Sequence, residues 1–190
     1  MRTIQYNRPE AVSYARRWAL GRNPRYFDFT EIGGDCTNFV SQCIYAGAGV
    51  MNYTPDVGWY YRSLYDRAAA WTGVEYLYNF LTTNESYGPF ASEVSESSVV
   101  AGDIIQLGNS YGDFYHSLFI LRTSPEILVA AHTNDALDRP LSTYNYDVAM
   151  FLHIDGVNTY LYKKKTMPVV LRHRLFLIIQ VMLQTYILPY

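Results

Sequence analysis

The sequence has only two cysteines and three lysines among its 190 residues, and it has no apolar run long enough to cross a membrane. Two cysteines allow at most one disulfide within the chain, which excludes a disulfide-rich scaffold. The formal net charge is −2, so no overall basic field supports binding to nucleic acid through its phosphates. The first residues lack the apolar run of a secretory signal, and we expect no export signal in this chain.

Hydrophobic residues make up 49% of the sequence, which predicts a globular chain with a sizeable core rather than a disordered one. All 17 acidic residues lie before Gly156, and all three lysines lie after it. The sequence therefore predicts one domain over residues 1–156 and a basic, then apolar, appendage over 157–190. Its apolar run over 175–188 falls short of the ~20 residues of a membrane span. We expect either a packed terminal helix or weak contact with a membrane surface.

Helical patterns occupy the first half of the chain, and strand patterns follow. Apolar residues recur at intervals of three and four, with start and stop signals at the helix ends. The three expected helices run from Pro9 to a stop at Gly21, from Cys36 behind the cap Asp35 to about Ala46 before Gly47, and onward from a capping box of Thr72 and Glu75. Short apolar runs then predict strands over 103–107, 116–122, 127–132 and 148–153. Helices followed by strands are typical of the α+β class.

Gly33 and Gly34 precede Asp35 and Cys36 at the start of the second expected helix. A cysteine in the first turn of a helix faces unpaired N–H groups and the positive end of the helix dipole, which favour the thiolate. The glycines leave room for a substrate carbonyl to reach the sulfur. The N–H groups of the same turn can receive the oxyanion of a tetrahedral intermediate. This pattern predicts that Cys36 is a nucleophile.

Cys43 lies seven residues after Cys36 on the same expected helix. At ~1.5 Å per residue the two are about 10.5 Å apart, beyond the ~7 Å limit between the Cα atoms of a disulfide. We therefore expect both to be free thiols. Cys43 falls on the apolar stripe and is expected to be a buried packing residue.

A thiolate nucleophile needs a base and a third group that orients the base. His116 begins an expected strand after a polar loop, and we predict that it is the base. Residues 124–126 read as a hairpin turn, and this turn brings His132 or Asn134 opposite His116. We predict that His132 orients His116, with Asn134 or Asp135 as alternatives.

Several segments resemble, in order, the putative amidase domain family of Gram-positive bacteria over about residues 8–155. These segments are 34–42, Trp59 with Trp71, 102–105, 115–117 and 132–135. That family is similar to the NlpC/P60 and CHAP cysteine hydrolases. The resemblance implies a papain-like fold, with a helix-borne cysteine packed on a small antiparallel sheet. It also implies amide hydrolysis, usually in peptides of the cell wall. Cys36 matches the nucleophile, His116 the base and His132 the third polar position.

Aromatic residues are frequent after the cysteine helix, and the stretch 57–62 is the densest near it. Trp59 and Tyr60 either pack in the core or on the surface, as most aromatic residues do, or line a groove and stack on sugar or peptide, where Arg62 would meet a substrate carboxylate. Asp35 is foremost a helix cap and secondarily a ligand for a substrate amine. Asp103 serves either the turn before its strand or catalysis.

We therefore predict a monomeric cysteine amidase or peptidase that acts on peptides or peptidoglycan fragments through a thioacyl intermediate and needs no cofactor. Two alternatives remain. One is a non-catalytic module that holds cell-wall fragments. The other is a zinc protein with Cys36, His116 and His132 as ligands, although no paired-cysteine or His-Glu-x-x-His pattern is present.

Overall fold

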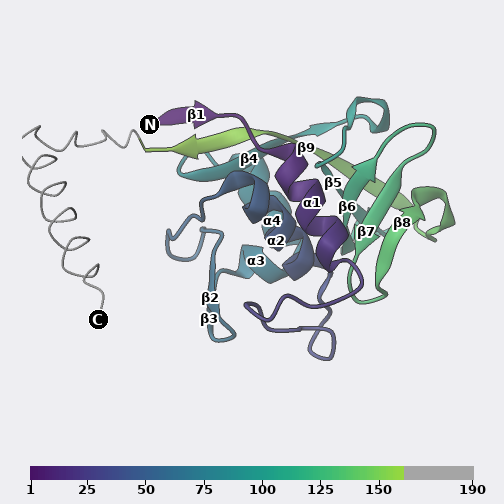
Figure 1. The fold of residues 1–190 in the computed structure, drawn as a ribbon, viewed down its shortest axis with the longest axis horizontal. Coiled ribbons are helices and arrows are strands. Elements are labelled where there is room, and N and C mark those ends of the chain that lie inside the picture. The colour runs from purple at the N-terminus through teal and green to yellow at the C-terminus, as the bar shows by residue number, and fades with distance from the viewer. Residues whose placement is uncertain (161–190) are drawn as a thin grey trace, which may run out of the picture. The chain divides into compact units, whose positions relative to one another are not determined.

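Helices α1, α2 and α4 pack against an antiparallel sheet in the computed structural model, which describes residues 1–160 (Figure 1). The helices are α1 (Arg8–Trp18), α2 (Cys36–Ala48), α3 (Ala69–Thr72) and α4 (Val74–Thr83). The short helix α3 packs on α2 and α4. This arrangement confirms the predicted α+β class.

The main sheet has seven strands, and every pairing in it is antiparallel. Its strands are β1 (Arg2–Ile4), β4 (Gly88–Val94), β5 (Ile104–Gly108), β6 (Phe114–Arg122), β7 (Leu128–Ala131), β8 (Ala136–Pro140) and β9 (Val148–Thr159). The order is β1-β9-β5-β6-β7-β8, and β4 also pairs with β9. A separate hairpin joins β2 (Tyr61–Ser63) to β3 (Asp66–Arg67), and single 3-10 turns lie at Glu96–Ser98 and Leu141–Thr143.

The hairpin of β6 and β7 has the register that the sequence predicts. Phe119 pairs with Ala130 and Ile120 with Val129, which centres the turn between residues 124 and 125. The predicted strand over 148–153 is part of the longer β9, which crosses Gly156 and continues to Thr159. The predictions for the basic and apolar appendage fall almost wholly outside the described residues.

Side chains alternate across the sheet and divide the core into two clusters. The helix-side cluster joins the helices to Ile104, Phe119, Leu121 and Ala130 of the sheet. The outer cluster lies on the opposite face and includes Ile105, Leu107, Leu118 and Ile120. Any residue of β6 can therefore be assigned to a face from its neighbours.

Helix α2 begins at Cys36 as predicted but ends two residues later than predicted. Gly47 lies inside the helix, where a Cβ would come within 2.3 Å of the Tyr6 ring and 2.8 Å of the Asn7 carbonyl. This glycine permits close packing, and the helix stops instead at Gly49, whose φ of 69° is left-handed.

The predicted capping box before α4 is not formed. Thr72 is the last residue of α3, its hydroxyl accepts a hydrogen bond from Arg67 Nε, and Gly73 precedes α4 without a side-chain cap. Within residues 1–160, no helix combines the length and apolar character needed to cross a membrane.

Candidate active site

The first turn of α2 is hydrogen-bonded to the sheet beside Cys36. Thr37 Oγ1 lies 3.0 Å from Ser117 Oγ on β6 and 3.8 Å from Cys36 Sγ. The Cys36 side chain is buried but for 7% of the residue's surface. Cys43 lies two turns further along α2 and is completely buried, which raises the pKa of its thiol. Both cysteines are free, as the helical spacing predicts.

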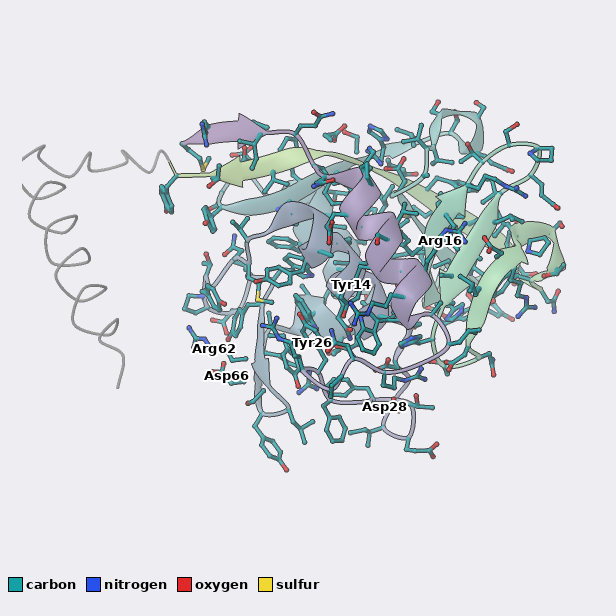
Figure 2. The ribbon with its side chains drawn as sticks, in the orientation of Figure 1. Tyr14, Arg16, Tyr26, Asp28, Arg62 and Asp66 are labelled. Atoms are coloured by element: carbon teal, nitrogen blue, oxygen red, sulfur yellow. The ribbon has the colours of Figure 1, made fainter. Side chains whose placement is uncertain are left out.

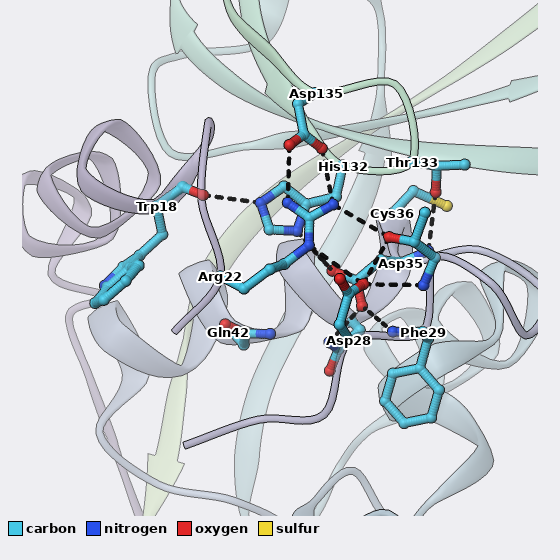
Figure 3. A network of polar contacts seen from close by, with 12 residues as sticks. Trp18, Arg22, Asp28, Phe29, Asp35, Cys36, Gln42, His132, Thr133 and Asp135 are labelled. Carbon is cyan, nitrogen blue, oxygen red and sulfur yellow. Dashed lines mark hydrogen bonds and ion pairs between the residues drawn. The ribbon is translucent and has the colours of Figure 1, made fainter. Parts of the chain in front are cut away.

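Asp35 precedes Cys36 and is completely buried, but it does not cap α2 as expected. Its Oδ1 accepts hydrogen bonds from the Phe29 backbone N–H and from Asn38 Nδ2, while Oδ2 lies 2.6 Å from His132 Nδ1 (Figure 3). The carboxylate is thus used entirely inside the protein. It has no exposed oxygen for a substrate amine, which corrects the expectation for this residue.

His132 is bound at both ring nitrogens. Nδ1 faces Asp35 Oδ2, and Nε2 lies 2.8 Å from the carbonyl oxygen of Trp18 (Figure 3). The ring also stacks on Phe39 of α2 with its centroid 4.0 Å away. Because both nitrogens are engaged here, neither is available to orient His116. The contacts place His132 as a support for Asp35 and the start of the cysteine helix.

Arg22 extends this network towards the surface. Its Nε lies 3.7 Å from Asp35 Oδ2 and 3.2 Å from Asp28 Oδ1. Asp135 accepts two hydrogen bonds of 2.9 Å from the same guanidinium, as Figure 3 shows. Asp135, the second alternative for the third catalytic position, is therefore an ion-pair partner of Arg22.

His116 stands beside a β-bulge near the start of β6. His116 pairs with Leu107 and Phe114 with Gly108, so Tyr115 is the extra residue between them. Bulges of this kind redirect side chains and are frequent next to active sites. The His116 ring lies 6.1 Å from that of Tyr144 and forms no hydrogen bond with any of residues 1–160.

Burial lowers the pKa of His116 to about 4, and the positive charge of Arg139 adds to the effect. The imidazole is therefore neutral at pH 7. A neutral imidazole can accept a proton, but a pKa of about 4 makes His116 a weak base in this conformation, and a nearby thiolate would raise that pKa by stabilising the imidazolium.

Cys36 and His116 lie near the same end of the sheet but on opposite faces of it. Ser117 points to Thr37 on the helix side, whereas His116 shares its face with Leu107 of the outer cluster. Within the described residues no hydrogen bond joins Cys36 Sγ to the His116 ring. The structure thus brings their backbones together without aligning the two reacting groups.

A cavity of about 340 Å³ surrounds His116. Its lining consists of Leu107, Tyr115, His116, Thr133, Asn134, Arg139, Tyr144 and Asn145. Thr133 Oγ1 accepts a 2.8 Å hydrogen bond from the backbone N–H of Asp35, so this wall adjoins the residue before Cys36. Asn134 shares the cavity with His116, and His132 does not.

The aromatic residues predicted to bind substrate have different positions. Trp59 is completely buried in the helix-side cluster, and its indole N–H donates to Ser41 Oγ at 3.0 Å. This burial corrects the expectation that Trp59 lines a groove. Arg62 packs over the Tyr60 ring and pairs with Asp66 at 3.2 Å on the β2–β3 hairpin (Figure 2). A substrate carboxylate would have to compete with Asp66 for the Arg62 guanidinium.

Asp103 belongs to a structural ion pair. It is completely buried, and its carboxylate binds Arg8 at 2.6 Å and His153 Nδ1 at 2.8 Å. It also accepts hydrogen bonds from the backbone N–H groups of Val100 and Ile154. These contacts join α1 to the sheet and agree with the turn interpretation rather than the catalytic one.

The zinc alternative finds no support in the described part of the chain. Among residues 1–160, no three side chains of the metal-binding types His, Cys, Asp and Glu gather closely enough to hold an ion. The two ring nitrogens of His132 are also occupied by protein acceptors.

Sequence reasoning missed Arg139, Tyr144 and Asn145, all of which line the His116 cavity. They follow the predicted hairpin, on β8 and the segment beyond it, and no spacing pattern marks them. The contact between Thr37 and Ser117 was also unforeseen, although each is adjacent in sequence to a predicted catalytic residue.

Comparison with known proteins gives one family match, to the putative amidase domain, over residues 5–154. The uncharacterized protein YhbB of Bacillus subtilis (strain 168) is 32% identical over 107 residues, which cover 55% of this chain and 33% of YhbB. The match therefore spans about a third of that relative's length. No solved structure matches this chain. A match to an amidase domain indicates a hydrolase that acts on amide bonds.

Proposed function

Since the chain belongs to the putative amidase domain family, we propose that it is a cysteine hydrolase with a papain-like arrangement and that it cleaves amide bonds in peptides of the cell wall. In this proposal Cys36 is the nucleophile and His116 is the base. Asn134 takes the third position in place of His132. The activity proposed concerns this domain, which covers only part of its relative YhbB.

One observation carries the proposal. Cys36 opens α2 at the end of the sheet where the neutral imidazole of His116 lines a cavity. Thr133 belongs to that cavity and binds the backbone N–H just before Cys36. The backbone next to Cys36 therefore adjoins the opening that His116 lines, and we infer that substrate binding brings the two side chains within reach of each other.

The failure of Asp35 to cap α2 also favours catalysis. Because its carboxylate turns to Phe29 and His132, the N–H groups of the first turn of α2 receive no side-chain cap. The N–H groups of Cys36 and Thr37 accordingly have no acceptor among residues 1–160. Unfilled N–H donors at a helix start can stabilise the oxyanion that forms when a carbonyl is attacked.

The proposed reaction proceeds in two halves. His116 takes the proton of the Cys36 thiol, and the thiolate attacks the amide carbonyl to give a tetrahedral oxyanion. His116 then protonates the leaving amine, and a thioacyl group remains on Cys36. In the second half His116 removes a proton from water, the hydroxide attacks the thioester, and the acid product leaves with the thiol restored.

The reaction requires the His116 ring to approach Cys36 when substrate binds. Catalytic hydrogen bonds often close only in the substrate complex. The bulge at Tyr115 gives the start of β6 a local irregularity next to the ring that must turn. Asn134 lies in the same cavity and has an amide that can hold the turned imidazole.

The test is hydrolysis of purified cell wall by the intact chain, with the released fragments identified by mass. We expect new amine and carboxylate ends from the wild-type protein and none from the Cys36→Ala variant. Cys43→Ala is the matched control, because it removes a buried thiol from the same helix and should retain the activity. Full hydrolysis by Cys36→Ala would refute the mechanism.

Two results would refute the proposed substrate. The first is that wall fragments are cut only at sugar linkages. The second is that free peptides are hydrolysed while no fragments are released from the wall. The second result would leave the cysteine mechanism in place, since Cys36→Ala can be compared with Cys43→Ala on the free peptides as well.

A further inference from the structure

Arg139 is held in one orientation at the wall of the His116 cavity. Its Nε donates to Thr143 Oγ1 at 2.9 Å, and its Nη2 donates to the Thr143 carbonyl at 3.0 Å. The guanidinium carbon also lies 3.8 Å from the centroid of the Tyr144 ring. Three contacts thus fix a long side chain that would otherwise be mobile.

This arginine has no acidic partner among residues 1–160. Those residues contain ten arginines and 17 acids, yet no ion pair forms at Arg139. Its neighbour Asp138 pairs instead with Arg16. A guanidinium has five N–H donors, and only two of them are used here. The remaining donors are available to a ligand.

The cavity around Arg139 holds a second unused donor. The hydroxyl of Tyr144 is buried and donates a hydrogen bond to none of residues 1–160. Burial raises the pKa of Tyr144 more than the nearby Arg139 guanidinium lowers it, so the phenol keeps its proton at neutral pH. Buried polar groups are nearly always hydrogen-bonded, so this hydroxyl is available to water or to a ligand that enters the cavity.

The other residues that line the cavity carry no negative charge. No Asp or Glu lines the cavity, and its remaining polar side chains are neutral: His116, Thr133, Asn134, Asn145 and Tyr115. In a domain with an excess of seven acids, a cavity whose single charge is positive will attract an anion. A planar guanidinium matches a carboxylate through two parallel hydrogen bonds.

We propose that Arg139 and the Tyr144 hydroxyl bind a carboxylate of the substrate beside the amide that is cleaved. This inference rests on the proposed function and deepens it, because it selects amides that carry a carboxylate close to the scissile bond. It also moves the expected carboxylate contact from Arg62, which pairs with Asp66, to Arg139. Arg139 is thus a specificity residue at the wall of the proposed active site.

The experiment measures binding without turnover. In the Cys36→Ala protein, N-acetylalanine and its neutral counterpart N-acetylalaninamide are titrated, and dissociation constants are obtained from NMR shifts. The two probes differ in a carboxylate against an amide. We expect the carboxylate probe to bind about 10- to 100-fold more tightly, the range for hydrogen bonds to a charged group.

Adding Arg139→Met should abolish the preference between the two probes. Arg139→Lys keeps the positive charge but loses the planar pair of N–H donors, and it should retain part of the preference for the carboxylate probe. Tyr144→Phe removes a single donor and should reduce carboxylate binding by about 5- to 10-fold. Arg122→Met is the matched control, because Arg122 is an exposed arginine of β6 outside the cavity, and it should leave the preference unchanged.

Equal binding of the two probes in the parent protein would overturn the inference. An undiminished preference in either Arg139→Met or Tyr144→Phe would also overturn it, so Tyr144→Phe keeps the test decisive if Arg139→Met does not fold. Because the experiment measures binding, failure of this inference can be distinguished from failure of the proposed function. A carboxylate preference in a protein that hydrolyses no amide would refute only the latter.

Discussion

At the scale of single residues, the state of His116 determines what the site can do. A histidine in water has a pKa near 6.5, and here burial lowers the pKa to about 4. The imidazole is therefore neutral above about pH 5 in this conformation. In the proposed mechanism its pKa must rise when the ring approaches Cys36, because only a stronger base can take the thiol proton.

The lowered pKa of His116 predicts a stability change with pH. Between pH 6.5 and 4 the unfolded chain binds a proton at this residue and the folded protein does not. The contribution is therefore fully present above pH 6.5 and is lost as the pH falls towards 4. We expect it to lower the free energy of unfolding by about 2 kcal/mol between pH 7 and pH 5.

Urea unfolding of wild type and His116→Asn at these two pH values measures this contribution. Other groups titrate in both proteins, so the quantity of interest is the difference between the two pH dependences. The wild type should lose more stability than the variant. Equal losses would mean that His116 is not desolvated as the structure shows.

Residue types suggested candidate site residues more readily than they revealed contacts. Cys36 and His116 were predicted as catalytic residues because a helix start and a strand start each carry a reactive side chain. The contact between His132 and Asp35 could not be predicted, because the two residues are 97 positions apart in the sequence. Trp59 shows the same limit, because an aromatic residue near a site has the same sequence pattern whether it faces a groove or the core.

At the scale of elements, the start of α2 depends on a buried hydrogen-bonded pair. Asp35 and His132 are almost completely excluded from water, and their 2.6 Å contact joins the cysteine helix to the end of β7. The stacking of His132 on Phe39 adds a second contact to the same helix. This pair fixes where α2 begins and therefore where Cys36 lies.

Asp35→Ala should lower the free energy of unfolding by about 3–5 kcal/mol, because it leaves the buried donors of His132, Asn38 and the Phe29 backbone without an acceptor. Chemical denaturation measures the change. Asp66→Ala is the matched control, since it breaks an exposed pair with Arg62 and should cost less than about 1 kcal/mol. Equal effects of the two substitutions would show that the buried pair does not hold the helix.

Elements with local signals were predictable, and those that depend on distant partners were not. The β6–β7 hairpin follows from a turn of a few residues, and its register was confirmed. Strands β1, β4 and β8 were missed because each is short or mixed in polarity and gains its partner only in the folded sheet. The end of α2 was misplaced because Gly47 serves packing against Tyr6, which no local pattern reveals.

At the scale of the whole molecule, residues 1–160 form a compact unit of their own. The family match ends within it, at residue 154, and the sheet continues to Thr159. The described residues supply a core cluster on either side of the sheet. We therefore expect residues 1–160 to fold around a core of their own.

A chain that ends at residue 160 should unfold within a few degrees of the full chain, about the change that 1 kcal/mol produces in a domain of this size. It should also hydrolyse the same substrate at the same rate. Thermal unfolding followed by circular dichroism and an assay with free peptide check both points. A large drop in the melting temperature would show that residues 161–190 complete the core.

The most direct test of the central claim is to trap the covalent intermediate. Protein quenched in acid during hydrolysis, then digested and analysed by mass spectrometry, should carry the acyl part of the substrate on the peptide that contains Cys36. The adduct should be absent from Cys36→Ala and present in Cys43→Ala. Steady hydrolysis by Cys36→Ala at the wild-type rate, with no adduct on either cysteine, would contradict the account.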